Sequence, residues 1–223
     1  MSNSMVWRLI RKDLYLYRWL IGGALVAGLA SLVITGINDM TGTIGFILLL
    51  TSIVALGVFI AIYGIMTERK DKTLLFVLSL PISTTQYTLA KVGSSLIAFL
   101  IPWLVLTVTI GVLTLALDPP LDGRLPFTVT MMFFFLANFC VLIAVLLISG
   151  TEIWSVVGVV FTNILVSVYL TTVQQLPGIR EHIEGPIAVW SPTILTILAV
   201  EAGVIALSLG LTFFVQSRKK DFV

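Results

Sequence analysis

Few side chains in this sequence are suited to acid–base or nucleophilic chemistry. Its 223 residues include only 11 Asp and Glu, together with one Cys and one His. Asp118 and Asp122 stand close together in the turn-forming stretch DPPLDGRLP. An enzyme that transfers phosphate on lipids would need further aspartates at fixed helical spacing, and the sequence lacks them. No nucleophile–base pair lies in or beside the apolar runs. We therefore predict no catalytic residue and no enzyme activity.

The sequence also disfavours a metal site and a nucleotide site. Cys140 falls inside an apolar run and His182 falls in a loop, so the usual metal-ligand spacings of His and Cys do not occur within one chain. The phosphate-binding pattern G-x-x-x-x-G-K-[ST] is absent as well. We predict that this chain holds no metal and does not itself bind ATP.

Three polar side chains stand deep inside apolar runs, where such groups are functional candidates by default. At 1.5 Å per residue, Glu201 lies roughly 12 Å from one end of its run and Asn138 about 16 Å deep from the same side. Asn163 lies about 15 Å deep from the other side. In one interpretation the three side chains line a substrate path. In the other they hydrogen-bond one another and fix how the helices pack.

These residues belong to a chain that is too apolar for a soluble domain. Hydrophobic residues make up 58% of it and charged residues 11%, with a mean hydropathy of +1.11, whereas soluble domains carry about 25% charged residues. Six runs are long enough to cross a bilayer: residues 19–37, 43–66, 92–117, 127–148, 153–172 and 193–215. We predict an all-α membrane protein with six transmembrane helices in one membrane domain, residues 1–223.

The basic residues indicate the orientation, because cytoplasmic loops collect Lys and Arg. With both termini in the cytoplasm, only Arg124 and Arg180 fall outside. The remaining basic residues fall inside: Arg8, Arg11, Lys12, Arg18, Arg69, Lys70, Lys72, Lys91, Arg218, Lys219 and Lys220. An N-in, C-in topology follows.

Residues 5–18, MVWRLIRKDLYLYR, have the two-faced pattern of a helix that lies in the membrane interface. At 100° per residue, one face collects Arg8, Arg11, Lys12, Tyr15 and Arg18. The other face collects Val6, Leu9, Ile10, Leu16 and Tyr17. Asp13 falls on the apolar face. There it either reaches the interface or is the buried partner of a cytoplasmic base such as Lys72 or Lys91.

Residues 173–192 are too polar to span and predict an extracytoplasmic segment. Pro177 and Pro186 bracket a stretch with room for one or two helical turns, and Trp190 marks a membrane interface. We interpret Glu181 and His182 as solvated surface residues rather than ligands.

The segment TERKDKTLLFVLSLPISTTQYTLAK, residues 67–91, is the only long internal stretch that mixes dense charge with apolar residues. Its apolar block, residues 74–78, is too short to span a bilayer, and Pro81 disfavours helix at the preceding residue. Ser83 and Gln86 then have the spacing of a capping box that opens a new helix. We predict a short amphipathic elbow on the cytoplasmic face, too apolar to be left in water.

The order of residues in this elbow resembles the cytoplasmic segment between helices two and three of ABC-2 type permeases, the membrane subunits of ATP-binding cassette exporters. The matching positions are Glu68, Arg69, Thr73, Leu74, Leu78, Ser79, Pro81, Ser83 and Lys91. The resemblance extends over the chain in its basic amphipathic N-terminal helix, its six spans and its polar segment before the last span. One departure is Lys72, at a position where the family often has glycine.

The resemblance implies that the elbow is a coupling helix, which docks in a groove of a separate nucleotide-binding ATPase subunit. It implies that ATP and Mg are bound on that subunit, and that this chain pairs with a second permease subunit, as a homodimer or a heterodimer. It places the chain in the cell membrane, in contact with lipid and not with nucleic acid, in a prokaryote. The implied docking residues are Glu68, Arg69, Thr73, Leu74, Leu78, Ser79, Pro81 and Glu152.

Glu152 also fits an ordinary acidic residue at a helix N-terminus. The leading function is the permease subunit of an ABC exporter, which couples ATP hydrolysis by the other subunit to export of an unidentified substrate. The alternative is a six-helix substrate-binding membrane subunit of an uptake system, which has a similar length but does not need the elbow.

Overall fold

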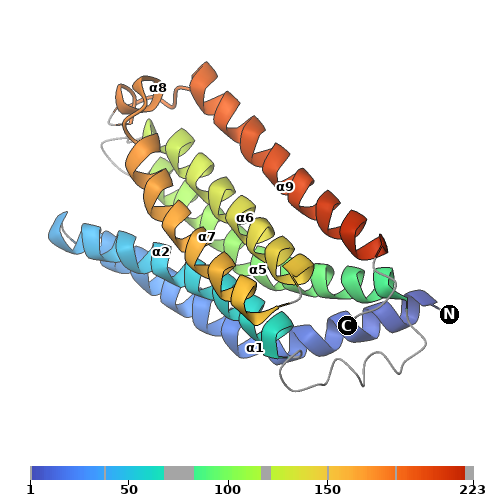
Figure 1. The fold of residues 1–223 in the computed structure, drawn as a ribbon. Coiled ribbons are helices and arrows are strands. Elements are labelled where there is room, and N and C mark those ends of the chain that lie inside the picture. Colours follow the sequence, from blue (N-terminus) through green and yellow to red (C-terminus); the bar gives the residue numbers. More distant parts are fainter. Residues whose placement is uncertain are drawn as a thin grey trace.

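The structure is a computed structural model that describes residues 2–37, 39–67, 83–116, 122–149, 151–183 and 185–218. Its elements in chain order are α1 (Ser2–Thr35), α2 (Asp39–Ala61), η1 (Ile62–Met66), α5 (Thr84–Ala116), α6 (Arg124–Ser149), α7 (Glu152–Val173), α8 (Pro177–Arg180) and α9 (Pro192–Arg218). Six helices in these ranges are long and apolar enough to cross a membrane, and each contains most of one predicted run. The chain is a multi-pass membrane protein whose regular structure, as far as it is described, is helical (Figure 1).

The ends of the long helices fall into two groups (Figure 1). The start of α1, the start of α5 and the end of α9 lie at one end of the bundle. The turn between α1 and α2 lies at the other end, as does the short helix α8. This arrangement agrees with an even number of spans. Which end faces the cytoplasm stays a prediction from the distribution of Lys and Arg.

Helix α6 is the centre of the bundle, since α2, α5, α7 and α9 all pack against it. Its buried side chains include Met132, Phe135 and Ile143. Helices in a bilayer gain little from the hydrophobic effect against one another, so close packing and satisfied polar groups hold them together. Trp103 of α5 illustrates both, because its half-buried side chain packs between the helices and its indole Nε1 donates a hydrogen bond of 2.7 Å to the Met132 carbonyl of α6.

Helix α1 runs without a break from Ser2 to Thr35, so residues 5–18 and the first span are two parts of one helix. The predicted basic face is exposed, and on the predicted apolar face Val6, Ile10 and Tyr17 are buried. Leu16 differs from the prediction, because it is 62% exposed. The buried face packs against α5 rather than facing only lipid. Whether this part of α1 lies in the membrane interface stays a prediction.

The connection between α7 and α9 folds over the end of the bundle. It contains α8, a single helical turn that begins at Pro177, where one or two turns were expected. Gly123, before α6, donates its backbone N–H to the Gly185 carbonyl at 3.0 Å, which ties two connections together. Glu181 is exposed as expected. His182 differs from the prediction of a solvated residue. It is half-buried, and its Nδ1 is buried without a hydrogen-bond partner in the described part of the chain, while its carbonyl accepts the Gly185 N–H in the same connection.

Gly45 lets α2 approach α1 closely. A Cβ atom at this position would lie 2.6 Å from the Ser31 carbonyl oxygen and 2.7 Å from the Thr35 backbone nitrogen. Real Cβ atoms essentially never come this close to other atoms, and backbone atoms in a helix cannot move aside as a flexible side chain does. The hairpin of α1 and α2 therefore requires glycine at residue 45, the small-residue packing typical of membrane helices.

We expect Gly45→Val to destabilise the protein by roughly 1–3 kcal/mol, the cost of overpacking a well-packed contact. Thermal unfolding of the purified protein in detergent measures this change. Gly23→Val is the matched control, because a Cβ at Gly23 of the same α1 meets nothing within 4 Å. Equal unfolding temperatures for the two variants would contradict the close contact.

Candidate functional site

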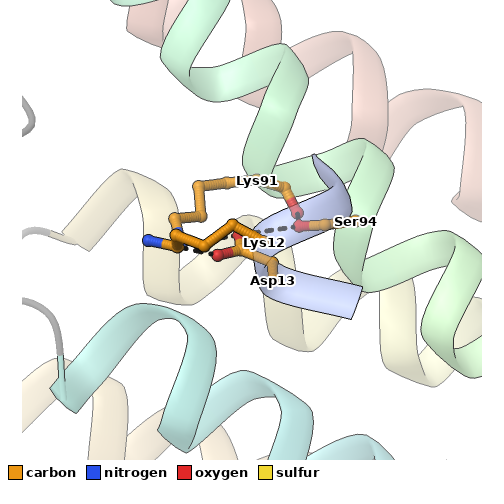
Figure 2. Close-up of polar contacts among 4 residues, drawn as sticks. All are labelled: Lys12, Asp13, Lys91 and Ser94. Atoms are coloured by element: carbon orange, nitrogen blue, oxygen red, sulfur yellow. Dashed lines mark hydrogen bonds and ion pairs between the residues drawn. The ribbon is translucent and has the colours of Figure 1, made fainter. Parts of the chain in front are cut away.

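A buried ion pair joins α1 to α5 beside the start of α5 (Figure 2). Lys91 Nζ of α5 lies 2.8 Å from Asp13 Oδ2 of α1, and the two side chains are only 5% and 3% exposed. Ser94 Oγ donates a second hydrogen bond to the same Asp13 oxygen at 3.1 Å. Lys12 Nζ lies 3.4 Å from the other oxygen, Asp13 Oδ1. The carboxylate is therefore held by two bases and one hydroxyl.

Local sequence explains why these side chains meet. Helix α5 begins where the capping box predicts: the Gln86 backbone N–H donates to Ser83 Oγ at 3.3 Å, and the Ser83 backbone N–H donates to Gln86 Oε1 at 3.0 Å. That start places Lys91 about two turns into the helix. On α1, Asp13 follows Ile10 on the buried face, so helical periodicity carries the carboxylate against α5.

Of the two interpretations of Asp13, burial against a base is confirmed. The base is Lys91, whereas Lys72 lies outside the described residues. Taking two charges out of water is costly, and the pair repays that cost only with close geometry and additional hydrogen bonds. Sequence reasoning did not find Ser94, although a hydroxyl three residues after Lys91 on the same helical face was a usable signal.

The neighbouring turn of α1 contacts the end of α2. Residues Ile62–Met66 form the π-helix η1, and the Thr67 hydroxyl donates to the Ile62 carbonyl at 3.3 Å. Single π-helical turns recur at functional sites. Gly64 of η1 is buried against the Tyr17 hydroxyl of α1, and a Cβ at Gly64 would overlap that oxygen. The sequence placed Tyr17 only on an apolar face and did not predict η1.

Through these contacts α1 connects the two helices on either side of residues 68–82, and we call this connection the α1 link. Within one turn of α1, Asp13 binds the helix that follows residues 68–82 and Tyr17 contacts the helix that precedes them. The candidate docking residues of the elbow lie outside the described residues: Glu68, Arg69, Thr73, Leu74, Leu78, Ser79 and Pro81. Glu152 is described and is the exposed first residue of α7, where its charge favours the helix N-terminus.

The three polar residues of the spans divide into two groups. Asn138 and Asn163 line the same cavity of about 20 Å³, which has room for about one water. Asn138 Oδ1 is buried without a partner in the described residues, and exposed Asn163 donates its Nδ2 to the Val159 carbonyl at 2.7 Å. Glu201 is absent from the lining of this cavity.

Glu201 has a partner that sequence reasoning missed. The Tyr169 hydroxyl of α7 donates a hydrogen bond of 2.6 Å to Glu201 Oε1 of α9. Glu201 is 5% exposed, and its Oε2 is buried with no hydrogen-bond partner among the residues described. The Tyr169 ring stacks on Phe134 of α6, with ring centroids 3.8 Å apart. The sequence could have indicated this partner, because Tyr169 lies inside an apolar run and a buried tyrosine hydroxyl needs a hydrogen-bond partner.

Comparison with known proteins identifies the chain's family. A family model described as "ABC-2 family transporter protein" matches residues 8–221. That range covers every described helix apart from the first turns of α1. A search of the curated proteins finds no match.

We expect loss of either charge of the ion pair to be costly. Asp13→Leu removes the carboxylate from a buried base and should lower the free energy of unfolding by about 3–5 kcal/mol. Lys91→Met should cost less, because Lys12 and Ser94 still contact the Asp13 carboxylate. The double variant Asp13→Leu with Lys91→Met, which removes both charges, should cost much less than the sum of the single changes.

Denaturant or thermal unfolding in detergent measures these differences. Arg11→Ala is the matched control, since Arg11 is an exposed base next to the pair, and we expect a change within about 0.5 kcal/mol. Additive costs in the double variant would show that the two charges do not depend on each other.

Proposed function

The chain belongs to the ABC-2 family of transporter membrane proteins and is a permease subunit of an ABC transporter, and we propose that it exports its substrate with energy from ATP hydrolysis on a separate subunit. This proposal makes the chain the transport subunit of an ATP-driven complex in a prokaryotic cell membrane. ATP and Mg would be bound by the partner. The family match favours this function over a substrate-binding subunit of an uptake system.

The α1 link, formed by the contacts of Asp13 with α5 and of Tyr17 with η1, is the observation that supports the proposal of ATP coupling. If an ATPase subunit moves residues 68–82, the motion reaches α2 through η1 and α5 through its first turns. Tyr17 and Asp13 of α1 contact both of these elements. Because buried, hydrogen-bonded charges resist separation, α1, η1 and the start of α5 would move together. A displacement of residues 68–82 by the ATPase subunit would thus move α1, η1 and α5 together.

The docking surface of the ATPase subunit would be the elbow itself. Its charged and hydroxyl residues and its apolar leucines are proposed to fill a groove of the ATPase: Glu68, Arg69, Thr73, Leu74, Leu78, Ser79 and Pro81. Glu152 would be a second contact. The start of α7, where Glu152 is exposed, lies at the same end of the bundle as the start of α5 (Figure 1). This position supports such a contact.

A second permease subunit is proposed to cover the outward face of α7. That face exposes apolar side chains such as Val160, Phe161 and Ile164, and between them Asn163 exposes an amide deep in the span. A polar group facing hydrocarbon is costly. Contact with another subunit, or with a hydrated substrate path along Asn138 and Asn163, removes that cost. Glu201 lies apart from these two asparagines, and as a candidate of the substrate path it would contribute an ionisable group beside Tyr169.

We expect Leu74→Asp or Leu78→Asp to leave the protein inserted in the membrane but to abolish co-purification of its ATPase subunit, since a carboxylate in an apolar groove is strongly disfavoured. Affinity purification from membranes measures the bound ATPase. Ile187→Asp is the control, because Ile187 is 70% exposed and lies in the connection at the opposite end of the bundle. Retained ATPase in the leucine variants would exclude docking at the elbow.

We expect Glu201→Gln to lower the ATP-driven activity of the assembled complex, because it removes an ionisable group while keeping an acceptor for the Tyr169 hydroxyl. ATP hydrolysis by the reconstituted complex, recorded across pH, measures the effect. Tyr169→Phe is the companion variant, since it removes the hydrogen bond and keeps the carboxyl group. A Glu201→Gln complex that matches the wild type at every pH would show that the charge has no role.

A further inference from the structure

A second, larger cavity lies at the end of the bundle opposite the start of α5. Its volume is about 490 Å³, within the range of about 300–1,000 Å³ that is usual for ligand pockets. Residues of α1, α2, α5 and α6 line it, with Gln174 and Ile183 from the connection after α7. Most of its wall is apolar: Leu32, Phe46, Leu49, Ile110, Phe127 and Met131. Nothing in the proposed coupling mechanism uses this cavity.

The arrangement of the helices explains why the cavity forms there. Helix α1 packs chiefly against α2 and α5, and α6 packs chiefly against α5, α7 and α9. At this end, α1 and α2 spread away from α5 and α6 (Figure 1). The side chains at the splayed ends do not fill the space between them. Because the cost of an empty cavity rises with its volume, a molecule that filled this space would stabilise the bundle.

The residues that line the cavity indicate which kind of molecule could bind there. Arg124, the exposed first residue of α6, reaches the cavity together with Thr128 and Gln174. Its guanidinium forms no ion pair in the part of the chain that the structure describes. From Arg124 to Met131, the cavity wall on α6 extends about 10 Å along the helix at 1.5 Å per residue. A cation at one end and hydrocarbon along the rest match a molecule with an anionic head and an apolar tail.

We propose that this cavity binds one anionic phospholipid from the surrounding bilayer. Its phosphate would lie against Arg124, whose planar fork of N–H donors suits phosphate oxygens. One acyl chain would fill the space between the α1–α2 hairpin and α5. The bound lipid would connect two halves of the bundle that are otherwise apart at this end. Water is a poor alternative occupant, because such a wall offers it few hydrogen-bond partners.

The test uses the purified full chain in neutral detergent, titrated with phosphatidylglycerol or phosphatidylcholine. Native mass spectrometry counts retained lipid, and thermal unfolding records the stabilisation. We expect one tightly retained phosphatidylglycerol, a higher unfolding temperature than with phosphatidylcholine, and no effect of free glycerol phosphate. In Arg124→Gln the affinity for phosphatidylglycerol should fall by roughly tenfold, the loss expected from a charge-assisted contact.

Arg180→Gln is the matched control. Arg180 is also exposed and ends α8 at the same end of the bundle, but it does not line the cavity, so its variant should keep the lipid preference. Leu113→Trp tests the apolar wall: Leu113 lines the cavity and is 47% exposed, and the larger ring should exclude the acyl chain. Each variant is compared only after gel filtration shows an unchanged elution volume.

Several results would overturn the proposal. Equal retention of both lipids by the wild type would show that the cation does not select the occupant. An unchanged preference in Arg124→Gln, or an equal loss in Arg180→Gln, would show attraction by general surface charge. Equal stabilisation by glycerol phosphate would show an anion site that needs no acyl chain. Release of the lipid during ATP turnover by the complex would identify the occupant as transported substrate and not as a resident lipid.

Discussion

The packing of the first part of α1 against α5 depends on a buried pair of opposite charges. Asp13 and Lys91 are 78 residues apart in sequence, yet their charged atoms lie 2.8 Å apart and both side chains are nearly excluded from solvent. Loss of one partner would be costly, because an uncompensated buried ion costs several kcal/mol. The pair therefore determines where the first part of α1 lies against α5. Ser94 completes it by donating to the carboxylate.

That constraint gives the N-terminal part of α1 a second role besides anchoring the chain. The same turn of the helix contacts η1 through Tyr17 and α5 through Asp13. The elements on either side of residues 68–82 are thus connected through α1 as well as through the chain between them. The π-helical turn at Ile62–Met66 belongs to this arrangement, because buried Gly64 there leaves room for the Tyr17 hydroxyl. In an ABC permease subunit, such a connection is a physical link between the two spans that flank residues 68–82.

Some polar groups within the membrane join two helices, and others have hydrogen-bond acceptors without a partner in the described part of the chain. Tyr169 and Glu201 join α7 to α9 by a hydrogen bond, so Glu201 takes part in helix packing through a tyrosine and not through either asparagine. Glu201 Oε2 and Asn138 Oδ1 are nevertheless buried without partners among the described residues, and Asn163 is exposed. Buried polar groups are ordinarily satisfied. Acceptors left open in an apolar bundle are therefore the places where water, another subunit or a substrate would bind.

The sequence by itself determined the six spans, the start of α5 and the family. The spans followed because a bilayer requires about 20 apolar residues in a helix that satisfies its own backbone. The start of α5 followed because Ser83 and Gln86 satisfy each other's backbone donors within one turn. The family followed from a local order of residues between 67 and 91, which the match over residues 8–221 confirms. The shape of residues 68–82 stays a prediction.

Only the tertiary structure decided which partners meet. Helical periodicity placed Asp13 on an apolar face but left Lys72 and Lys91 equally eligible, and the packing of α1 on α5 chose Lys91. Similar depth suggested that Glu201 would join the two asparagines, whereas α9 carries it to Tyr169. The physical reason is the same in both cases. A sequence pattern states which face of a helix a residue occupies, but long-range packing determines which helix lies opposite that face.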